Sequence, residues 1–374
     1  MKRIVVLGSG FAALTAVHTL RKQGHQGPIT IVSPKPELFF FPSLIWVPAG
    51  MRDRGDLTIP LTNWYAKHRV EHFNATVSGL DPAARLVKSD YGDISYDYLV
   101  IASGGRFIKK LPGIEHAAIP CQDFDQVARV RDRLKEMEGG NIAMGFAGNP
   151  NEPSAMRGGP MFEFLFGIDT LLRRQGRRDK FNITFFSPAP RPGQRLGERA
   201  VENLLKEMKR RGIETHLGHK MKGIEADRVI TEGGEIPSDL TLFMPGMTGP
   251  AWAAESGLPL SAGGFILADE NCRVPGFDTI FVAGDAGSYP GPDWMPKQAH
   301  MADLQAEAAA KNLLAVIAGR PAEHTFKVEL LCIVDALDGG ILVLRTLKRN
   351  ILFKLGLMHT IKRFFEWWYL RRYR

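Results

Sequence analysis

Residues 4–13 join a short apolar run to a glycine-rich turn, and this junction constrains the fold more than any other part of the chain. Ile4-Val5-Val6-Leu7 fits a buried strand, and Gly8-Ser9-Gly10-Phe11-Ala12-Ala13 follows it, with apolar residues at helical spacing beyond. Gly8 permits the tight turn, Gly10 lets the backbone approach a pyrophosphate, and Ala13 lets helix and strand pack closely. The helix N-terminus supplies N–H donors to phosphates. The junction therefore predicts a dinucleotide-binding Rossmann-like unit.

The second strand of this unit departs from the usual pattern. Ile29-Thr30-Ile31-Val32 ends in Ser33-Pro34-Lys35, where an acidic residue commonly binds the ribose hydroxyls of NAD. Ser33 can still hydrogen-bond a ribose, and Lys35 can lie near the adenosine phosphates. These residues favour a bound FAD, held by many other contacts, over a bound NAD.

Strand-like and helix-like segments alternate along the 374 residues, of which 44% are hydrophobic, enough to bury a large core. We predict the α/β class: two tandem Rossmann-like dinucleotide-binding domains, each three-layered, plus C-terminal amphipathic helices. The first domain should comprise residues 1–112 and 258–320. Residues 113–257 should form the second domain, and residues 321–374 a C-terminal segment that carries a cysteine.

Composition excludes several other classes. Met1-Lys2-Arg3 runs directly into the first strand, so we expect no cleavable secretory leader. Apolar runs stay shorter than the roughly 18 residues of a membrane span. The three cysteines form no C-x-x-C pair, which argues against a disulfide-stapled scaffold and against structural zinc; we predict no metal site.

Another strand-turn places a carboxylate where ligands bind in open α/β sheets. Asp278–Val282 is a strand that leads into Gly284-Asp285, so Asp285 should lie at its carboxyl end. We expect Asp285 to accept hydrogen bonds from ribityl hydroxyls; the alternative is a helix cap. The cofactor contacts predicted besides residues 8–13 and 33–35 are Pro42, Ser43, Val77, Ala102, Ser103, Gly104, Gly284, Asp285 and Lys297.

The C-terminus is basic and aromatic. From Arg345 onward there are nine Lys or Arg residues against one acid, Glu366. Apolar residues recur there at three- and four-residue steps, which is typical of an amphipathic helix. The run Trp367-Trp368-Tyr369 with flanking arginines suits the headgroup level of a bilayer. A pair of helices on a membrane surface is therefore expected, with core helices against the flavin domain as the alternative. No other feature supports nucleic-acid binding.

Several motifs, taken in order, resemble those of a known family. They are Gly8 to Ala13, Phe39-Phe40-Phe41-Pro42-Ser43 with Trp46, Tyr96 to Gly104, Gly159-Pro160-Met161-Phe162-Glu163, Gly264 to Glu270, Phe281 to Asp285, Pro296-Lys297 and Cys332-Ile333-Val334-Asp335. Nearly end to end, the chain is similar to the sulfide:quinone oxidoreductases and to the flavoprotein subunit of flavocytochrome c sulfide dehydrogenase.

The resemblance implies a function. In this family, a cysteine pair on one face of FAD oxidises sulfide, and quinone is reduced on the other face. The late redox cysteine falls on Cys332, and the early one, near the flavin 8-methyl edge and bonded to it in some members, on Cys121. The nearby acid falls on Glu163, and the lysine close to the flavin on Lys297. The expected partners are quinone and a small sulfur donor. The chain is expected to be a peripheral protein of the bacterial inner membrane and to form a homo-oligomer.

The chain departs from this family at one position. The central redox cysteine falls on Arg157, so the usual disulfide with Cys332 cannot form, and thiol exchange needs two sulfurs. Arg157 can lower the pKa of Cys332 if the two are close, bind an anionic substrate, or lie solvated in a loop. The donor can therefore differ from sulfide.

The type II NADH dehydrogenases share the architecture and are an alternative. Their second domain carries a full Gly-x-Gly-x-x-Gly, whereas here residues 145–153 read GFAGNPNEP, and the prolines remove N–H donors. The next strand ends in Phe185-Phe186-Ser187-Pro188, without an acid. NAD(P)H binding is disfavoured. The remaining alternative is an FAD-binding electron-transfer subunit of a flavocytochrome c-like complex.

Overall fold

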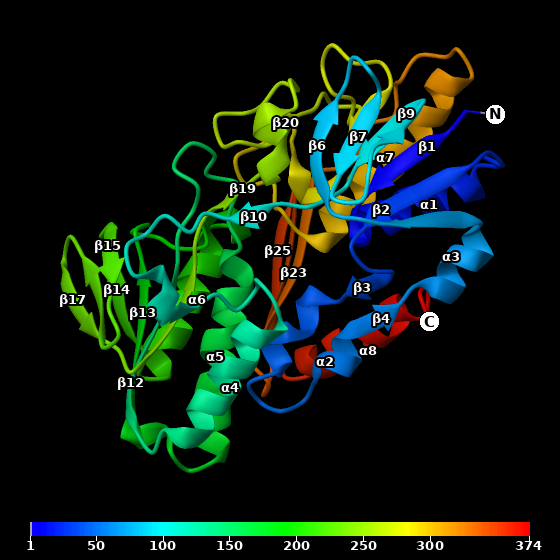
Figure 1. Ribbon diagram of the computed structural model, residues 1–374. Helices are drawn as coiled ribbons and strands as arrows, with labels where there is room; N and C mark the ends of the chain where they lie inside the picture. Colours follow the sequence, from blue (N-terminus) through cyan, green and yellow to red (C-terminus); the bar gives the residue numbers. More distant parts are fainter. Residues whose placement is uncertain (1) are drawn as a thin grey trace.

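Two α/β domains lie side by side, with the C-terminal strands between them (Figure 1). The structure is a computed structural model that describes residues 2–374. In Figure 1 the first domain is mostly blue and cyan, the second is green, and the C-terminal segment is orange to red. The predicted α/β class with two dinucleotide-binding-type domains is confirmed. Among residues 2–374 we find no helix with the length and apolar character that crossing a membrane requires.

The first domain is built on a five-stranded parallel sheet of order β21-β9-β1-β2-β5. Its strands are β1 (Ile4–Leu7), β2 (Ile29–Ser33), β5 (Val70–Asn74), β9 (Tyr98–Ile101) and β21 (Ile280–Val282). All four residues of β1 are buried, as expected for a central parallel strand covered on both faces. The accompanying helices are α1 (Phe11–Lys22), α2 (Arg54–Leu57), α3 (Thr62–His68) and α7 (Ala299–Ile317).

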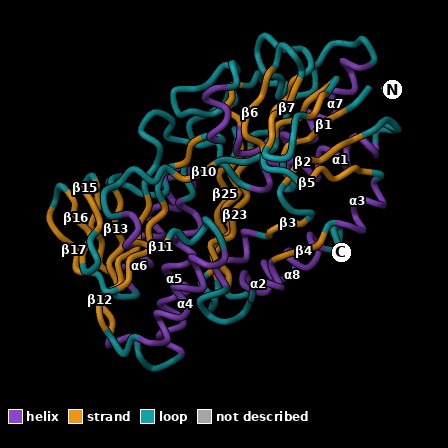
Figure 2. The backbone as a smooth tube through the Cα atoms, in the orientation of Figure 1, coloured by secondary structure: helices purple, strands orange, loops and turns teal. Residues whose placement is uncertain are grey.

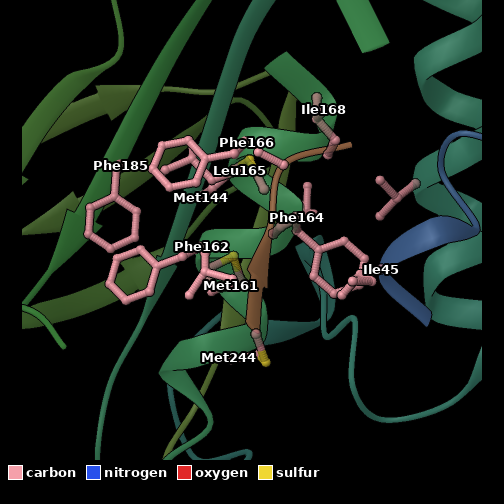
Figure 3. Close-up of a cluster of buried hydrophobic side chains, with 14 of the residues drawn as sticks. Ile45, Met144, Met161, Phe162, Phe164, Leu165, Phe166, Ile168, Phe185 and Met244 are labelled. Carbon is pink, nitrogen blue, oxygen red and sulfur yellow. The ribbon is translucent and has the colours of Figure 1, made fainter. Parts of the chain in front are cut away.

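The second domain repeats this plan with the parallel order β11-β18-β12-β13-β14. Its strands are β11 (Ala117–Ala118), β12 (Gly140–Phe146), β13 (Phe181–Ser187), β14 (Glu214–Leu217) and β18 (Leu240–Met244), and its helices are α4 (Phe124–Glu136), α5 (Gly158–Arg174) and α6 (Glu198–Arg210). Figure 3 shows side chains of α5 packed against Phe185 and Met144 on one side and facing Ile45 on the other. The apolar surface of α5 thus joins the second sheet to a 3-10 helix of the first domain, residues 41–46.

Short strands complete both domains. They are β3 (Glu37–Phe39), β4 (Thr58–Pro60), β6 (Val77–Asp81), β7 (Leu86–Ser89), β8 (Ile94–Ser95), β10 (Arg106–Phe107), β15 (Met221–Ile224), β16 (Arg228–Thr231), β17 (Gly234–Pro237), β19 (Met247–Thr248), β20 (Ile266–Leu267) and β22 (Gly287–Ser288). Figure 2 shows β6 and β7 beside the first domain's sheet and β15, β16 and β17 at the outer end of the second domain.

The C-terminal segment differs from the prediction of paired helices, which is wrong for its first half. It forms an antiparallel sheet of β23 (Glu329–Asp335), β24 (Gly340–Thr346) and β25 (Asn350–Leu355), followed by one helix, α8 (Met358–Leu370). Leu344 lies opposite Ile351 in the hairpin, so residues seven apart meet across two strands instead of along one helix. A seven-residue apolar spacing fits both arrangements, and pairing with β23 selects the strands.

Charged groups anchor this sheet to the second domain. The guanidinium of Arg211 contacts Asp169 at 3.0 Å, Glu207 at 2.7 Å and Asp338 at 3.1 Å. Asp338 lies in the turn between β23 and β24, and Lys354 on β25 contacts Glu207 at 2.9 Å. Because a guanidinium offers five donors in a fixed fork, Arg211 can bind three carboxylates at once and hold the sheet in place.

Candidate active site

A cavity of about 1770 Å³ is lined by both domains and by the C-terminal segment. Its walls include the turn between β1 and α1, the loop before α5, the segment around Lys297, strand β23 and helix α8. The predicted residues that line it are Gly8, Ser9, Gly10, Phe11, Ala12, Pro34, Lys35, Pro42, Ser43, Ala102, Ser103, Gly104, Cys121, Arg157, Glu163, Gly284, Asp285, Lys297 and Cys332. Residues up to 324 positions apart thus share one chamber.

The turn between β1 and α1 is shaped for a close ligand. Gly8 has φ +104°, and a Cβ there would lie 2.5 Å from the carbonyl oxygen of Ala102, so only glycine fits. A Cβ on Gly10 would meet no protein atom within 4 Å, and Gly10 caps α1 without a side-chain hydrogen bond. The N-terminal N–H groups of α1 are therefore available to a ligand in the cavity.

Three predicted cofactor contacts do not line the cavity. Ala13 is fully buried between helix and strand, which is the packing role predicted for it. Ser33 is buried, and its hydroxyl donates to the carbonyl of Lys35 at 2.8 Å, so the structure does not support its predicted hydrogen bond to a ribose. Val77 lies on β6 and packs against a core of the first domain, so its placement does not support a cofactor contact.

Arg157 and Asp285 form an ion pair across the cavity. Arg157 precedes α5 and donates from Nη2 to the Asp285 carboxylate at 2.5 Å, with side chains 25% and 11% exposed. The reading of Arg157 as a solvated loop residue is therefore wrong. Asp285 is joined to the second domain and does not cap a helix, and its Oδ2 is already occupied by a donor.

Cys332 lies on β23, beside the first turn of α5. Its Sγ is 3.7 Å from the position that a Cβ on Gly159 would occupy. Burial, assisted by the nearby Glu163, raises the pKa of Cys332 to about 12 against the lowering effects of Lys362 and Arg195. Arg157 does not contribute, so the expected lowering of the Cys332 pKa by Arg157 is not found. The group is a neutral thiol at physiological pH.

Cys121 also lines the cavity, in the segment before α4. Burial raises the pKa of this thiol to about 11, and the nearby Arg157 guanidinium lowers it only in part. Cys121, Cys272 and Cys332 are all free thiols. The predicted bond between Cys121 and a flavin remains a prediction.

Glu163 sits in a buried polar network that the sequence did not reveal. On α5, Glu163 pairs with Lys362 of α8 and accepts the backbone N–H of Asp335 at 2.9 Å. Asp335 in turn accepts from Trp46 at 2.7 Å and lies 2.8 Å from His359. Burial raises the pKa of Glu163 to about 7 against the lowering effects of the Lys362 ammonium and the Asp335 N–H. Its carboxyl can therefore hold or release a proton near neutral pH.

Two further cations border the cavity near Asp285. Arg195, not predicted as a site residue, donates to the carbonyl of Met156 at 2.8 Å and also to that of Ser154, which fixes the loop before α5. Lys297 donates to the carbonyl of Gly287 at 2.7 Å, and its Nζ lies 3.8 Å from the centroid of the Phe265 ring. Burial lowers the pKa of Lys297.

One side of the cavity opens through apolar side chains of α8. Ile361, Phe365 and Trp368 line the cavity and are also 44%, 45% and 47% exposed. Phe364 and Trp367 on the same helix are exposed without lining it. Exposed aromatic residues gathered around a cavity opening indicate a surface for an apolar partner.

Residues 2–306 match the pyridine nucleotide-disulphide oxidoreductase family. The chain belongs to this family. Membership confirms an FAD-dependent oxidoreductase, and it agrees with the strand–turn–helix at residues 4–13 and with the two parallel sheets.

Two proteins of known name that are similar to this chain both reduce quinones. The chain is 27% identical over 356 residues to the sulfide-quinone reductase of Aquifex aeolicus, covering 89% of this chain and 81% of that protein. It is 26% identical over 359 residues to the type II NADH:quinone oxidoreductase of Staphylococcus aureus, covering 90% and 89%.

Solved structures show the same architecture. The sulfide:quinone oxidoreductase of Aquifex aeolicus superposes with a TM-score of 0.91 at 26% identity, covering 100% of this chain and 92% of that one. Putidaredoxin reductase, in its covalent complex with putidaredoxin, has a TM-score of 0.72 at 18% identity, covering 95% and 87%, and shares the fold.

The cavity fits the family's cofactor. Gly8 and Gly10 leave room beside the N-terminus of α1 for a pyrophosphate, and Lys35 lines the adjoining wall. The volume of about 1770 Å³ exceeds the several hundred Å³ typical of a small-ligand pocket, as a long dinucleotide plus a second reactant requires. Residues 8–12, 34–35, 42–43 and 102–104 are those that would hold FAD.

Proposed function

We propose that this oxidoreductase passes electrons from a small sulfur-containing donor to a quinone at a membrane surface. When bound, FAD supplies reversible two-electron chemistry between the two reactants. The proposal includes peripheral attachment to the bacterial inner membrane.

The observation that carries the proposal is the apolar opening on α8. A quinone is lipid-soluble, so its reductase needs a path that leads from lipid to the reacting centre. Ile361, Phe365 and Trp368 belong to both the outer surface and the cavity wall. Arg371 and Arg372 stack on Trp367 and Trp368 at 5.1 and 5.2 Å, a pairing of cation and ring that suits lipid headgroups. A protein acceptor has less need of such an opening, which disfavours the flavocytochrome c-like alternative.

The loop before α5 disfavours NADH as the donor. In the first domain two glycines and a serine separate strand from helix, whereas residues 147–157 separate β12 from α5. The carbonyls of Ser154 and Met156 in this loop are bonded by Arg195, and Gly193 packs near Phe162 of α5. This loop stands in place of the short glycine turn that lets a pyrophosphate approach α1 in the first domain.

Side chains of the cavity have roles that follow from their positions. Glu163 can deliver a proton to a reduced quinone, because its pKa lies near 7 and Lys362 connects it to α8, the helix at the opening. Cys332 can take the outer sulfur of a persulfide, from which a thiolate leaves, only after the neutral Cys332 thiol has lost its proton, since its pKa is raised to about 12. Sulfide itself brings no oxidised sulfur to exchange, so its oxidation is expected to be slow.

Anaerobic stopped-flow mixing tests the donor. Flavin absorbance at equal concentrations of sulfide, polysulfide, a thiol and NADH should fall fastest with one of the sulfur compounds, and a soluble quinone analogue should restore it. Cys332→Ser should abolish reduction by thiol or persulfide, and Cys272→Ala, which alters a cysteine outside the cavity, should not. NADH as the fastest donor would contradict the proposal.

Vesicle binding tests the acceptor side. The change is Phe364→Ser with Trp367→Ser, because both side chains are exposed and neither lines the cavity. Each large apolar side chain moved out of water contributes roughly 1.5–3 kcal/mol, so partitioning into anionic vesicles should fall at least about tenfold. Tyr91→Ser, on the most exposed large aromatic of the first domain, is the matched control. Equal partitioning of all three proteins would contradict membrane attachment through α8.

A further inference from the structure

Three cationic side chains line the cavity near one another, and only two carboxylates offset their three positive charges. Arg157, Arg195 and Lys297 all line the cavity, although they come from segments far apart in the sequence. Two carboxylates act on them: Asp285, bonded to Arg157, and Glu152, which also accepts a hydrogen bond from the Ser261 hydroxyl.

The cluster is held in place by neutral partners. Arg195 donates to two backbone carbonyls, and Lys297 donates to a third and lies over the ring of Phe265. Carbonyls and rings fix the direction of a cation without cancelling its charge. The Nε of Arg157 is buried and has no hydrogen-bond partner among the described residues. A donor that is buried and unpaired at the wall of a cavity is costly unless a ligand accepts from it.

The chemistry of these groups selects a class of ligand. Guanidinium groups bind carboxylates and other oxyanions with several charge-assisted hydrogen bonds. The N-terminus of the 17-residue helix α5, which begins directly after Arg157, adds a partial positive charge on the same side. Cys332 Sγ lies against the first turn of this helix, as the contact with Gly159 shows. A ligand between the two arginines would therefore face the thiol.

We propose that a small oxyanion, a carboxylate or a sulfur oxyanion, binds between Arg157 and Arg195 beside Cys332. The inference deepens the proposed function and rests on it, because a sulfur oxyanion bound there is the small donor. It also assigns a role to Arg157: at the position where the family resemblance predicts a redox cysteine, this arginine binds the donor by its charge. The competing account is that the cations serve FAD alone.

Calorimetric titration of the FAD-loaded protein distinguishes the two accounts, because the cofactor already occupies its own place. Sulfite, thiosulfate and acetate are titrated separately, which separates sulfur oxyanions from carboxylates. At least one should bind, and Arg157→Gln should weaken that binding about tenfold or more through the lost charge-assisted hydrogen bonds. Arg191→Gln is the control, because Arg191 lies on the same loop as Arg195, pairs with Glu198 of α6 and does not line the cavity. It should change the affinity less than about twofold, as expected for a partly exposed charge outside the cavity.

A second measurement needs no variant. Iodoacetate and iodoacetamide alkylate the same thiol and differ in charge, so the ratio of their rates at Cys332, read by peptide mass spectrometry, reports the local field. The cluster should raise this ratio at least about threefold above the ratio at an unstructured cysteine peptide. The bound oxyanion should also protect Cys332 from both reagents. If Arg157→Gln loses FAD, this measurement on the unmodified protein decides the matter alone.

Absence of binding by all three probes, together with a rate ratio no higher than that of the peptide, would overturn the inference. A protein that binds no oxyanion but still reduces a quinone analogue would leave the proposed function standing. A protein that binds an oxyanion and reduces no quinone would keep the oxyanion site and contradict the proposed function.

Discussion

The two α/β domains share the order of four sheet strands, β9-β1-β2-β5 and β18-β12-β13-β14, and differ at the turn where a dinucleotide would bind. In the first domain β1 ends at Leu7 and α1 begins at Phe11, with open space over Gly10. In the second domain β12 ends at Phe146 and α5 begins only at Gly158, and the loop between them is tied down by Arg195. Both helices still point their N-termini at the same cavity.

This difference shows that the same strand–turn–helix unit need not bind a dinucleotide in both domains. A parallel sheet with a following helix provides a positive N-terminus in both domains. Only the first domain has a short glycine turn before that terminus, as a pyrophosphate requires. The first turns of α5 instead face side chains of the C-terminal segment: Gly159 lies against Cys332, and Glu163 pairs with Lys362. The N-terminal turns of α5 therefore form a part of the cavity wall that contacts a thiol and an ion pair.

The largest expected effect comes from filling the open turn. Gly10→Val should abolish FAD binding, because its side chain would occupy the approach of the pyrophosphate. A Cβ at this position meets no protein atom within 4 Å, so the chain should still fold. Flavin absorbance per chain and a cooperative thermal transition measure the two outcomes. Gly148→Val makes the same change in the loop of the second domain and should keep full absorbance, since its Cβ would press on the flexible end of Met156 and lie in ordinary contact, at 3.7 Å, with the carbonyl oxygen of Pro153. Full flavin absorbance in the Gly10→Val protein would show that the turn of the first domain does not bind the pyrophosphate.

The next effect concerns NADH. If the loop closes the second turn, flavin reduction by NADH should be at least about a hundredfold slower than by the best sulfur donor, since several N–H contacts to phosphate are missing at about 1 kcal/mol or more each. Single-turnover absorbance traces under anaerobic conditions measure both rates. Saturable, fast reduction at micromolar NADH would mean that the loop opens readily.

Arg195→Met tests what holds the loop. Removing the guanidinium leaves the carbonyls of Ser154 and Met156 without their donor, which should lower the free energy of unfolding by about 1–3 kcal/mol. Denaturant titration measures the change, and Arg191→Met, at a partly exposed ion pair on the same loop, should cost less than about 1 kcal/mol. If both variants are equally stable, Arg195 does not fix the loop.

Local patterns predicted much of this fold, and contacts between distant residues explain what they missed. The turn at Gly8 to Ala13 and the bounds of β1, β2 and β21 follow from neighbours in sequence, within about two residues. The helical prediction from Arg345 onward is wrong up to residue 355, because the spacing of Leu344 and Ile351 fits both a helix and a hairpin, and only the partner strand decides between them. The pair Arg157–Asp285 joins residues 128 apart, and Glu163–Lys362 joins residues 199 apart. No sequence period encodes such pairs.

The smallest effect is a pH dependence that separates Glu163 from an ordinary carboxylate. Its pKa in the folded protein is raised from 4.5 to about 7, so the folded state binds more protons than the unfolded state between these values. The contribution to stability is therefore full below about pH 4.5 and is lost as the pH rises through 7. Over the same range the carboxyl loses the proton that it can give to a reduced quinone, so reoxidation should slow as the pH rises through 7.

Glu163→Gln should flatten both profiles, because the amide does not titrate. Glu207→Gln is the contrasting control: the Arg210 hydrogen bond holds the pKa of Glu207 well below its usual value. That carboxylate stays ionised across pH 5–8, so its removal should lower stability evenly and leave the slope unchanged. Denaturant titrations between pH 5 and 8 give the slopes, and stopped-flow reoxidation by a quinone analogue gives the rates. Equal slopes in the wild-type and Glu163→Gln proteins would show that α5 supplies a structural ion pair to the cavity and no proton.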